Sequence, residues 1–260
     1  MTDPLLEVSG LVVRFGAVQA LSEVSFAVSA GSIHSIIGPN GAGKSSLLNV
    51  LSGLYRAASG TVSWNGESLI GMRPDQIARR GIGRSFQNVG LASQESVAEN
   101  IMFGRHLLMT TGMLANGLGL PEARRQERAH RKRVAEIAEF VGLTPWLDSP
   151  VAELSYGHQK RVDLARALAT EPRMLLLDEP AAGMNASEKG EIARLIRSVV
   201  DSLGMTVLLV EHDMEMVMGL SHRITVLNFG RVIAEGTPSQ IQADPEVIGA
   251  YLGGTAEVPQ

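Results

Sequence analysis

The segment from Gly38 to Ser45 has the residue types and spacing of a polyphosphate-binding loop. It reads GPNGAGKS, which fits the pattern G-x-x-x-x-G-K-[ST] between a strand-like and a helix-like segment. Small residues let backbone N–H groups approach a polyphosphate, and the following helix start adds partial positive charge. We predict that Lys44 neutralises the β- and γ-phosphates and that the Ser45 hydroxyl binds Mg²⁺. The alternative is a simple glycine turn. The predicted nucleotide-binding residues of this segment are Gly38, Pro39, Asn40, Gly41, Ala42, Gly43, Lys44, Ser45 and Ser46.

Two adjacent carboxylates follow the apolar run Met174–Leu177. Ligands of α/β proteins bind at the carboxyl ends of such buried strands. There Asp178 would hold a metal ion and Glu179 would polarise an attacking water. The alternative is that both carboxylates cap the next helix. Together with the glycine loop, the pair favours phosphoryl transfer.

A second candidate anion loop begins at Leu154. The residues Ser155, Tyr156, Gly157, His158 and Gln159 precede a helical pattern, so exposed N–H groups at that helix start could meet a phosphate. Taken alone, Ser155 would be an ordinary helix N-cap. The chain therefore has two phosphate-type loops and one metal-binding strand end.

Alternating strands and helices must position these residues. Short apolar runs predict buried parallel strands at Ile33–Ile37, Met174–Leu177 and Thr206–Val210. Leucines at helical spacing predict a helix that starts after Lys44 and continues to Leu54. Asn185, with Glu188 three residues later, predicts a capping box that starts a helix through Leu203. The pattern indicates an α/β fold with a mainly parallel sheet.

Composition excludes several classes of protein. The chain has 260 residues, a net charge of −4, 45% hydrophobic residues and no cysteine, so disulfides, thiolate metal sites and cysteine nucleophiles are excluded. Its uncharged stretches contain too many glycine and polar residues to span a membrane, and the N-terminus lacks the pattern of a secretion signal. We expect a soluble cytoplasmic protein, and the acidic balance argues against nucleic acid.

The order of the motifs resembles that of the ATP-binding cassette (ABC) ATPase family. It runs from the glycine loop through Gln87 and Leu154-Ser155-Tyr156-Gly157 to LLLDEP and then His212 in LLVEHD. The resemblance covers essentially the whole chain. It implies a P-loop fold with a mainly parallel core sheet, an N-terminal antiparallel β subdomain and an inserted helical subdomain. It further implies one domain over 1–260, with a nucleotide-binding core at 1–87 and 167–260 and a helical subdomain at 88–166.

The family resemblance also implies roles for individual residues. ATP and Mg²⁺ are the implied cofactors, and two such domains pair head-to-tail, each glycine loop facing the other's Ser155–Gln159 loop. Phe15 resembles the aromatic residue that stacks on adenine; the alternative is a strand-core Phe. Gln87 resembles the glutamine that reaches the metal and the attacking water. His212 resembles the histidine that contacts the γ-phosphate, which makes Glu179, His212 and Lys44 the implied catalytic residues.

A closer resemblance is to the ATP-binding subunits of branched-chain (hydrophobic) amino acid importers. It rests on the DEPAAGMN, EHDM and VLNFG segments and on the tail DPEVIGAYLG. His158 stands where a second glutamine is usual. The resemblance implies membrane permease subunits and, indirectly, a solute-binding protein as partners. The chain would then lie peripherally on the cytoplasmic face of the cell membrane.

Other functions stay open at this point. One alternative is a non-transport ABC ATPase acting on nucleic acid or ribosomes, and another is an ABC subunit for a different solute, such as urea or lipid. A basic cluster between Arg124 and Arg133 is either a solvated helix face or a surface for lipid head groups.

Overall fold

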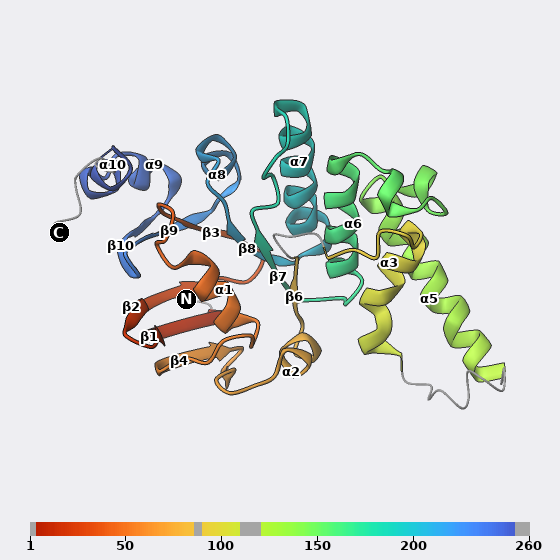
Figure 1. Ribbon diagram of the computed structural model, residues 1–260, viewed down its shortest axis with the longest axis horizontal. Helices are drawn as coiled ribbons and strands as arrows, with labels where there is room; N and C mark the ends of the chain where they lie inside the picture. The colour runs from red at the N-terminus through yellow and green to blue at the C-terminus, as the bar shows by residue number, and fades with distance from the viewer. Residues whose placement is uncertain (1–3, 86–89, 110–120, 253–260) are drawn as a thin grey trace.

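Two β-sheets carry the helices of the chain in the computed structural model, which describes residues 4–85, 90–109 and 121–252 (Figure 1). The smaller sheet is antiparallel, in the order β2-β1-β4-β5. Its strands are β1 (Leu6–Phe15), β2 (Val18–Val28), β4 (Ser59–Trp64) and β5 (Glu67–Ser68). Asn65 and Gly66, both at positive φ, form the turn between β4 and β5.

The larger sheet has the order β10-β9-β3-β8-β7-β6. Every neighbouring pair is parallel except β9 and β10. Its strands are β3 (Ile33–Ile37), β6 (Ile82–Arg84), β7 (Met174–Asp178), β8 (Thr206–Val210), β9 (Arg223–Asn228) and β10 (Arg231–Gly236). The β3, β7 and β8 strands are buried along their whole length, as their apolar sequences predict.

Helices cover the core sheet on both faces and extend beyond it on one side (Figure 1). They are α1 (Lys44–Leu51), α2 (Pro74–Arg79), α3 (Val97–Gly104), α5 (Pro121–Phe140), α6 (Tyr156–Leu168), α7 (Ala186–Leu203), α8 (Met214–Leu220), α9 (Pro238–Gln242) and α10 (Pro245–Leu252). Short 3₁₀ turns lie at η1 (Arg105–Leu108), η2 (Thr144–Trp146) and η3 (Val151–Glu153). Among the described residues, no helix is long and apolar enough to cross a bilayer.

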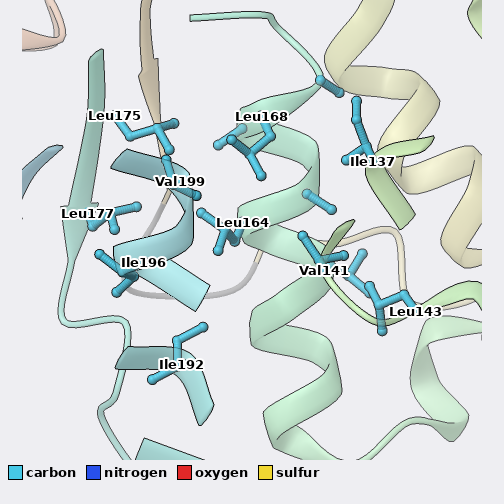
Figure 2. Close-up of a cluster of buried hydrophobic side chains, with 14 of the residues drawn as sticks. Ile137, Val141, Leu143, Leu164, Leu168, Leu175, Leu177, Ile192, Ile196 and Val199 are labelled. Atoms are coloured by element: carbon cyan, nitrogen blue, oxygen red, sulfur yellow. The ribbon is translucent and has the colours of Figure 1, made fainter. Parts of the chain in front are cut away.

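Alternate residues of the central strands pack into two separate cores. Leu175 and Leu177 join the core beneath α3, α5, α6 and α7, which Figure 2 shows in close-up. Leu176, the residue between them, joins the opposite core with α1 and the antiparallel sheet. Because side chains alternate along a strand, α1 and α6 therefore lie on opposite faces of the core sheet.

The predicted α/β architecture is confirmed, and so is the capping box of α7. Glu188 N donates to Asn185 Oδ1 at 3.0 Å, and Asn185 N donates to Glu188 Oε2 at 3.0 Å. The predicted extension of the first helix to Leu54 is wrong, because α1 ends at Leu51. Gly53 follows at φ +75°, where a Cβ would lie 2.8 Å from the Met72 carbonyl oxygen, and Leu54 beyond it is exposed.

The described part of the basic cluster lies on the outer side of α5. Arg131 pairs with Glu127 at 2.9 Å, and Arg133 pairs with Glu136 at 2.9 Å. Exposed pairs of this kind along one helix contribute little to stability and are typical of a solvated face.

Candidate nucleotide-binding and hydrolysis site

The glycine loop joins the end of β3 to the start of α1. A Cβ on Gly38 would lie 2.0 Å from the Leu227 carbonyl oxygen, and one on Gly43 would lie 2.6 Å from the Ala20 carbonyl oxygen. Larger residues at these two positions would push the loop away from β2 and β9. The glycines thus hold the loop close to the sheet, with Asn40, Gly41 and Ser45 exposed to solvent.

Lys44 folds back over the loop that precedes it. Its Nζ donates to the Gly38 carbonyl at 2.7 Å and to the Pro39 carbonyl at 3.0 Å. Burial lowers the pKa of Lys44, while the carboxylates of Glu179 and Asp178 act in the opposite direction. The ammonium group thus lies between the glycine loop and the carboxylates at the end of β7, where a polyphosphate would need a cation.

Asp178 ends β7 as a buried carboxylate. Burial raises its pKa, against the opposing effect of Arg84, whose Nη2 lies 3.2 Å from Asp178 Oδ2. Among the described atoms, Asp178 Oδ1 is buried without a hydrogen-bond partner. Such an oxygen is suited to a hard cation such as Mg²⁺ or to one of its waters.

The protein groups near Asp178 do not enclose a metal by themselves. In the described part of the chain, no group of three or more His, Asp or Glu side chains is placed to hold a metal ion. This arrangement fits Mg²⁺, which is usually bound by one or two carboxylates together with substrate phosphates.

Glu179 and His212 meet at the ends of β7 and β8. The Glu179 backbone has φ +48°, a conformation that costs about 1–3 kcal/mol in a non-glycine residue and is common at functional sites. Its Oε1 lies 3.9 Å from Nδ1 of His212, whose side chain is 60% exposed. An exposed imidazole and a partly buried carboxylate therefore face the same solvent-accessible space.

Glu211 holds the loop that carries His212. It is fully buried, and its Oε2 accepts hydrogen bonds from His212 N at 2.8 Å and from Asp213 N at 3.2 Å. Its Oε1 accepts from Ala181 N at 2.9 Å. One carboxylate thus fixes the His212 loop relative to the turn that follows Glu179.

The second candidate loop starts α6. Ser155 is the N-cap, and its Oγ lies 3.4 Å from His158 N and 2.9 Å from His158 Nδ1. Gln159 Nε2 donates to the Leu154 carbonyl at 3.0 Å, which fixes the base of the loop. Tyr156 is exposed and lies beside Gly183, where a Cβ would be 3.2 Å from its ring. The loop therefore caps the helix, with Ser155 and Tyr156 exposed, Gly157 buried, and His158 and Gln159 partly exposed.

The structure brings some of the predicted site residues together and separates others. Lys44, Asp178 and Glu179 lie near one another, and His212 joins Glu179. The Ser155–Gln159 loop starts α6, which lies on the opposite face of the sheet from α1. The two candidate anion loops thus begin helices that cover opposite faces of the core sheet.

Phe15 is exposed at the end of β1. Its side chain is 46% exposed, and its ring makes an edge contact with Tyr55 at a centroid distance of 5.0 Å. A strand-core role for Phe15 is therefore wrong, and its ring lies at the surface. Gln87 lies outside the described residues.

Sequence reasoning missed three residues of this region: Arg84, Glu211 and Tyr251. Burial raises the pKa of Tyr251, which is hydrogen-bonded to the backbone of Gly38. A charged residue directly after the apolar strand Thr206–Val210 was a signal for Glu211. Arg84 and Tyr251 had no such signal, because their partners are distant in the sequence.

Comparison with known proteins decides the family. A family model described as ABC transporter matches residues 21–182. The chain belongs to the ABC transporter ATPase family. A second model, described as branched-chain amino acid ATP-binding cassette transporter, matches residues 231–257 of this ABC ATPase.

Two relatives cover nearly all of this ABC ATPase. The high-affinity branched-chain amino acid transport ATP-binding protein BraF of Pseudomonas aeruginosa is 42% identical over 253 residues, spanning 97% of this chain and 99% of the relative. The protein of the same description, LivG of Escherichia coli, has the same identity and coverage.

Solved ABC structures have the same fold. A nucleotide-free ATP-binding cassette of an ABC transporter superimposes with a TM-score of 0.84 at 30% identity, covering 96% of this chain and 99% of that one. The ADP conformation of an ABC cassette gives a TM-score of 0.85 at 31% identity, with 97% and 100% covered. A dimeric cassette in a post-hydrolysis state with ADP and Pi gives 0.74 at 26% identity, with 90% and 98% covered. The predicted family and fold class are thus confirmed.

Proposed function

We propose that this chain is the ATP-binding and ATP-hydrolysing subunit of an importer for branched-chain or other hydrophobic amino acids. The observation that carries the proposal is 42% identity, over nearly the whole length of both chains, to two branched-chain amino acid transport ATP-binding proteins. The match of residues 231–257 to a model of the same description supports it. These relatives do not favour a non-transport ATPase acting on nucleic acid or ribosomes.

ATP binds over the glycine loop in this proposal. Backbone N–H groups of the Gly38–Ser46 segment other than Pro39, which has none, hold the phosphates, and Phe15 stacks on the adenine. Lys44 exchanges its bonds to the Gly38 and Pro39 carbonyls for bonds to phosphate oxygens. Mg²⁺, when bound with ATP, neutralises phosphate charge; Ser45, Asp178 and the predicted ligand Gln87 would hold it. The buried, unpaired Oδ1 of Asp178 supports this assignment.

Glu179 accepts a proton from the attacking water. Its position beyond the end of β7, held by the bond from Glu179 N to the Val210 carbonyl at 2.8 Å, directs the carboxylate toward the His212 side of the site. His212 and Lys44 stabilise the charge on the transferred phosphoryl group. Glu211 keeps His212 in place by binding its backbone N–H.

A second ABC ATPase domain, identical or paralogous, completes each site. Because α1 and α6 lie on opposite faces of one sheet, the Ser155–Gln159 loop is available to a neighbouring molecule's glycine loop. Closure of the pair over ATP would move the 88–166 helical subdomain relative to the 1–87 and 167–260 core. That movement would drive separate permease subunits, placing this chain at the cytoplasmic face of the membrane.

Reconstitution tests the proposal. The chain is placed in proteoliposomes with candidate permease subunits and a solute-binding protein of an amino acid importer, together with a companion ATPase where one is required. ATP and Mg²⁺ are supplied inside. Uptake of labelled leucine, coupled to ATP hydrolysis, is the expected result. Hydrolysis stimulated by DNA or ribosomes but not by the permease would contradict the proposal.

A further inference from the structure

His158 contacts the hydroxyl group of Ser155, the N-cap residue of α6. Its Nδ1 lies 2.9 Å from Ser155 Oγ, and its own backbone N–H donates to the same oxygen at 3.4 Å. His158 is therefore linked to the Ser155 hydroxyl twice, once through its ring and once through its backbone N–H. The glutamine usual at this position in the resembling family has no ring nitrogen to place there.

The hydrogen atoms between His158 Nδ1 and Ser155 Oγ can be arranged in two ways. A serine hydroxyl has one hydrogen and can accept two hydrogen bonds. If Nδ1 carries a hydrogen, Ser155 Oγ accepts from both the ring and the backbone, and its own hydrogen is free to point outward. If Nδ1 carries no hydrogen, the Ser155 hydroxyl donates its hydrogen to Nδ1. The protonation of one nitrogen thus determines whether Ser155 can donate to an anion.

The surroundings of His158 fix the ring and bear on its charge. The Trp146 ring of η2 lies at a centroid distance of 4.1 Å and a 40° interplanar angle. Burial lowers the pKa of His158, and Arg161 on α6 acts in the same direction, while Glu191 and Glu188 on α7 oppose them. Arg161, Glu188 and Glu191 line a small hollow together with His158, Ser155 and Met184.

We propose that His158 is a positioning residue that, by donating from Nδ1 to Ser155 Oγ, directs the Ser155 hydrogen toward a phosphate of the ATP held by the partner domain. The inference rests on the proposed function. Protonation of the ring at lower pH forces a hydrogen onto Nδ1, so it selects the state in which Ser155 can donate outward. The contact therefore makes engagement of the second anion loop depend on pH.

Two substitutions separate this role from simple packing. His158→Asn keeps an amide donor near the position of Nδ1 but removes the ring that lies against Trp146. His158→Phe keeps a ring against Trp146 but removes the donor. We expect His158→Phe to raise the ATP concentration for half-maximal hydrolysis by about tenfold, because it weakens the hydrogen bond from Ser155 to a charged phosphate. We expect His158→Asn to show only a small part of that rise.

The pH profile is the second readout, measured on the assembled transporter. Because burial and Arg161 lower the pKa of His158, its ring gains a proton below pH 6.5. Between pH 7 and pH 5 the wild type should therefore gain ATP affinity relative to His158→Asn, whose amide does not titrate. Combining Ser155→Ala with His158→Asn or with wild-type His158 should remove that difference. His106→Gln, an exposed histidine outside the site, is the control and should follow the wild type.

The outcomes are distinct for the two proposals. An Asn variant that loses more affinity than the Phe variant, or profiles that coincide for wild type and His158→Asn, would overturn the role of His158. An assembly without ATP hydrolysis would instead contradict the proposed function. In that case ¹⁵N NMR of the isolated full chain still tests the contact: Ser155→Ala should shift the Nδ1 signal of His158 and leave His106 unchanged, and an unshifted Nδ1 signal would overturn the inference.

Discussion

Arg84 and Asp178 form a largely buried ion pair that joins two parts of the candidate hydrolysis site. Arg84 Nη2 lies 3.2 Å from Asp178 Oδ2, and its Nη1 donates to Asn49 Oδ1 at 2.8 Å and to Ser52 Oγ at 2.6 Å. The pair therefore connects the carboxylate at the end of β7 to the helix that follows the glycine loop. It also leaves Oδ1 of Asp178 as the oxygen available to a cation.

Arg84→Ala should destabilise the fold by about 3–5 kcal/mol, because it removes the ion-pair partner and hydrogen bond of a buried carboxylate. Adding Asp178→Asn to Arg84→Ala should recover part of this loss. Urea unfolding at pH 7 measures both effects. Arg80→Ala is the matched control, because Arg80 makes an exposed pair with Glu67 at 3.2 Å, and it should cost at most about 1 kcal/mol. Equal losses for the two arginines would show that the Arg84 pair has no special role.

Phe15→Ala should weaken ATP binding by about three- to tenfold, the effect of one aromatic contact, while tripolyphosphate binding stays unchanged. Isothermal titration with the two ligands measures this difference. Phe229→Ala provides the control, since Phe229 is 87% exposed on the turn between β9 and β10. Equal weakening of both ligands by Phe15→Ala would show that Phe15 supports the fold rather than the base.

His34 should make the fold sensitive to acid. It is buried in β3, its Nε2 lies 2.8 Å from Thr225 Oγ1, and burial lowers its pKa to about 4. The unfolded chain binds a proton near pH 6.5, whereas the folded chain does so near pH 4, so the free energy of unfolding should fall across this window by up to about 3 kcal/mol.

Replacement of His34 isolates this contribution. Urea unfolding of wild type and His34→Asn at pH 7 and pH 4.5 should show a smaller acid loss in the variant, since its side chain does not titrate. Identical slopes with pH in the two proteins would mean that other groups cause the acid sensitivity.

Glu179→Gln should reduce ATP hydrolysis by about 10²- to 10⁴-fold, the usual contribution of a general base. ATP binding should persist, because the change removes a charge without altering side-chain shape. Phosphate release and size-exclusion chromatography with Mg²⁺ and ATP measure the two properties, and the variant should stay paired with its partner domain. A fully active, unpaired variant would refute the composite site.

The sequence could predict the elements whose residues carry local signals. Apolar runs located β3, β7 and β8, and Asn185 with Glu188 located the start of α7. Leucine spacing alone extended α1 too far, because the chain leaves the helix at Gly53, which has φ +75° and no room for a Cβ beside the Met72 carbonyl. Arg84 could not be paired with Asp178, because 94 positions separate them and only the parallel pairing of β6 with β7 makes them neighbours.

Motif spacing likewise predicted ATP hydrolysis, but it did not predict how the two candidate anion loops are arranged in space. Glycines and helix starts predicted two candidate anion loops. Their placement on opposite faces follows from the alternation of Leu175, Leu176 and Leu177 between two cores, which depends on which helices pack on each face. That placement is the main structural reason for expecting a pair of domains.

Cross-linking tests that pairing most directly, because the chain has no cysteine of its own. Asn40→Cys and Tyr156→Cys are each made in a Glu179→Gln background, and the two proteins are mixed and treated with a bifunctional thiol reagent. Mg²⁺ and ATP should produce cross-links that join one variant to the other, and neither variant alone should cross-link. Cross-links that form equally without ATP, or within a single chain that carries both cysteines, would contradict the head-to-tail composite site.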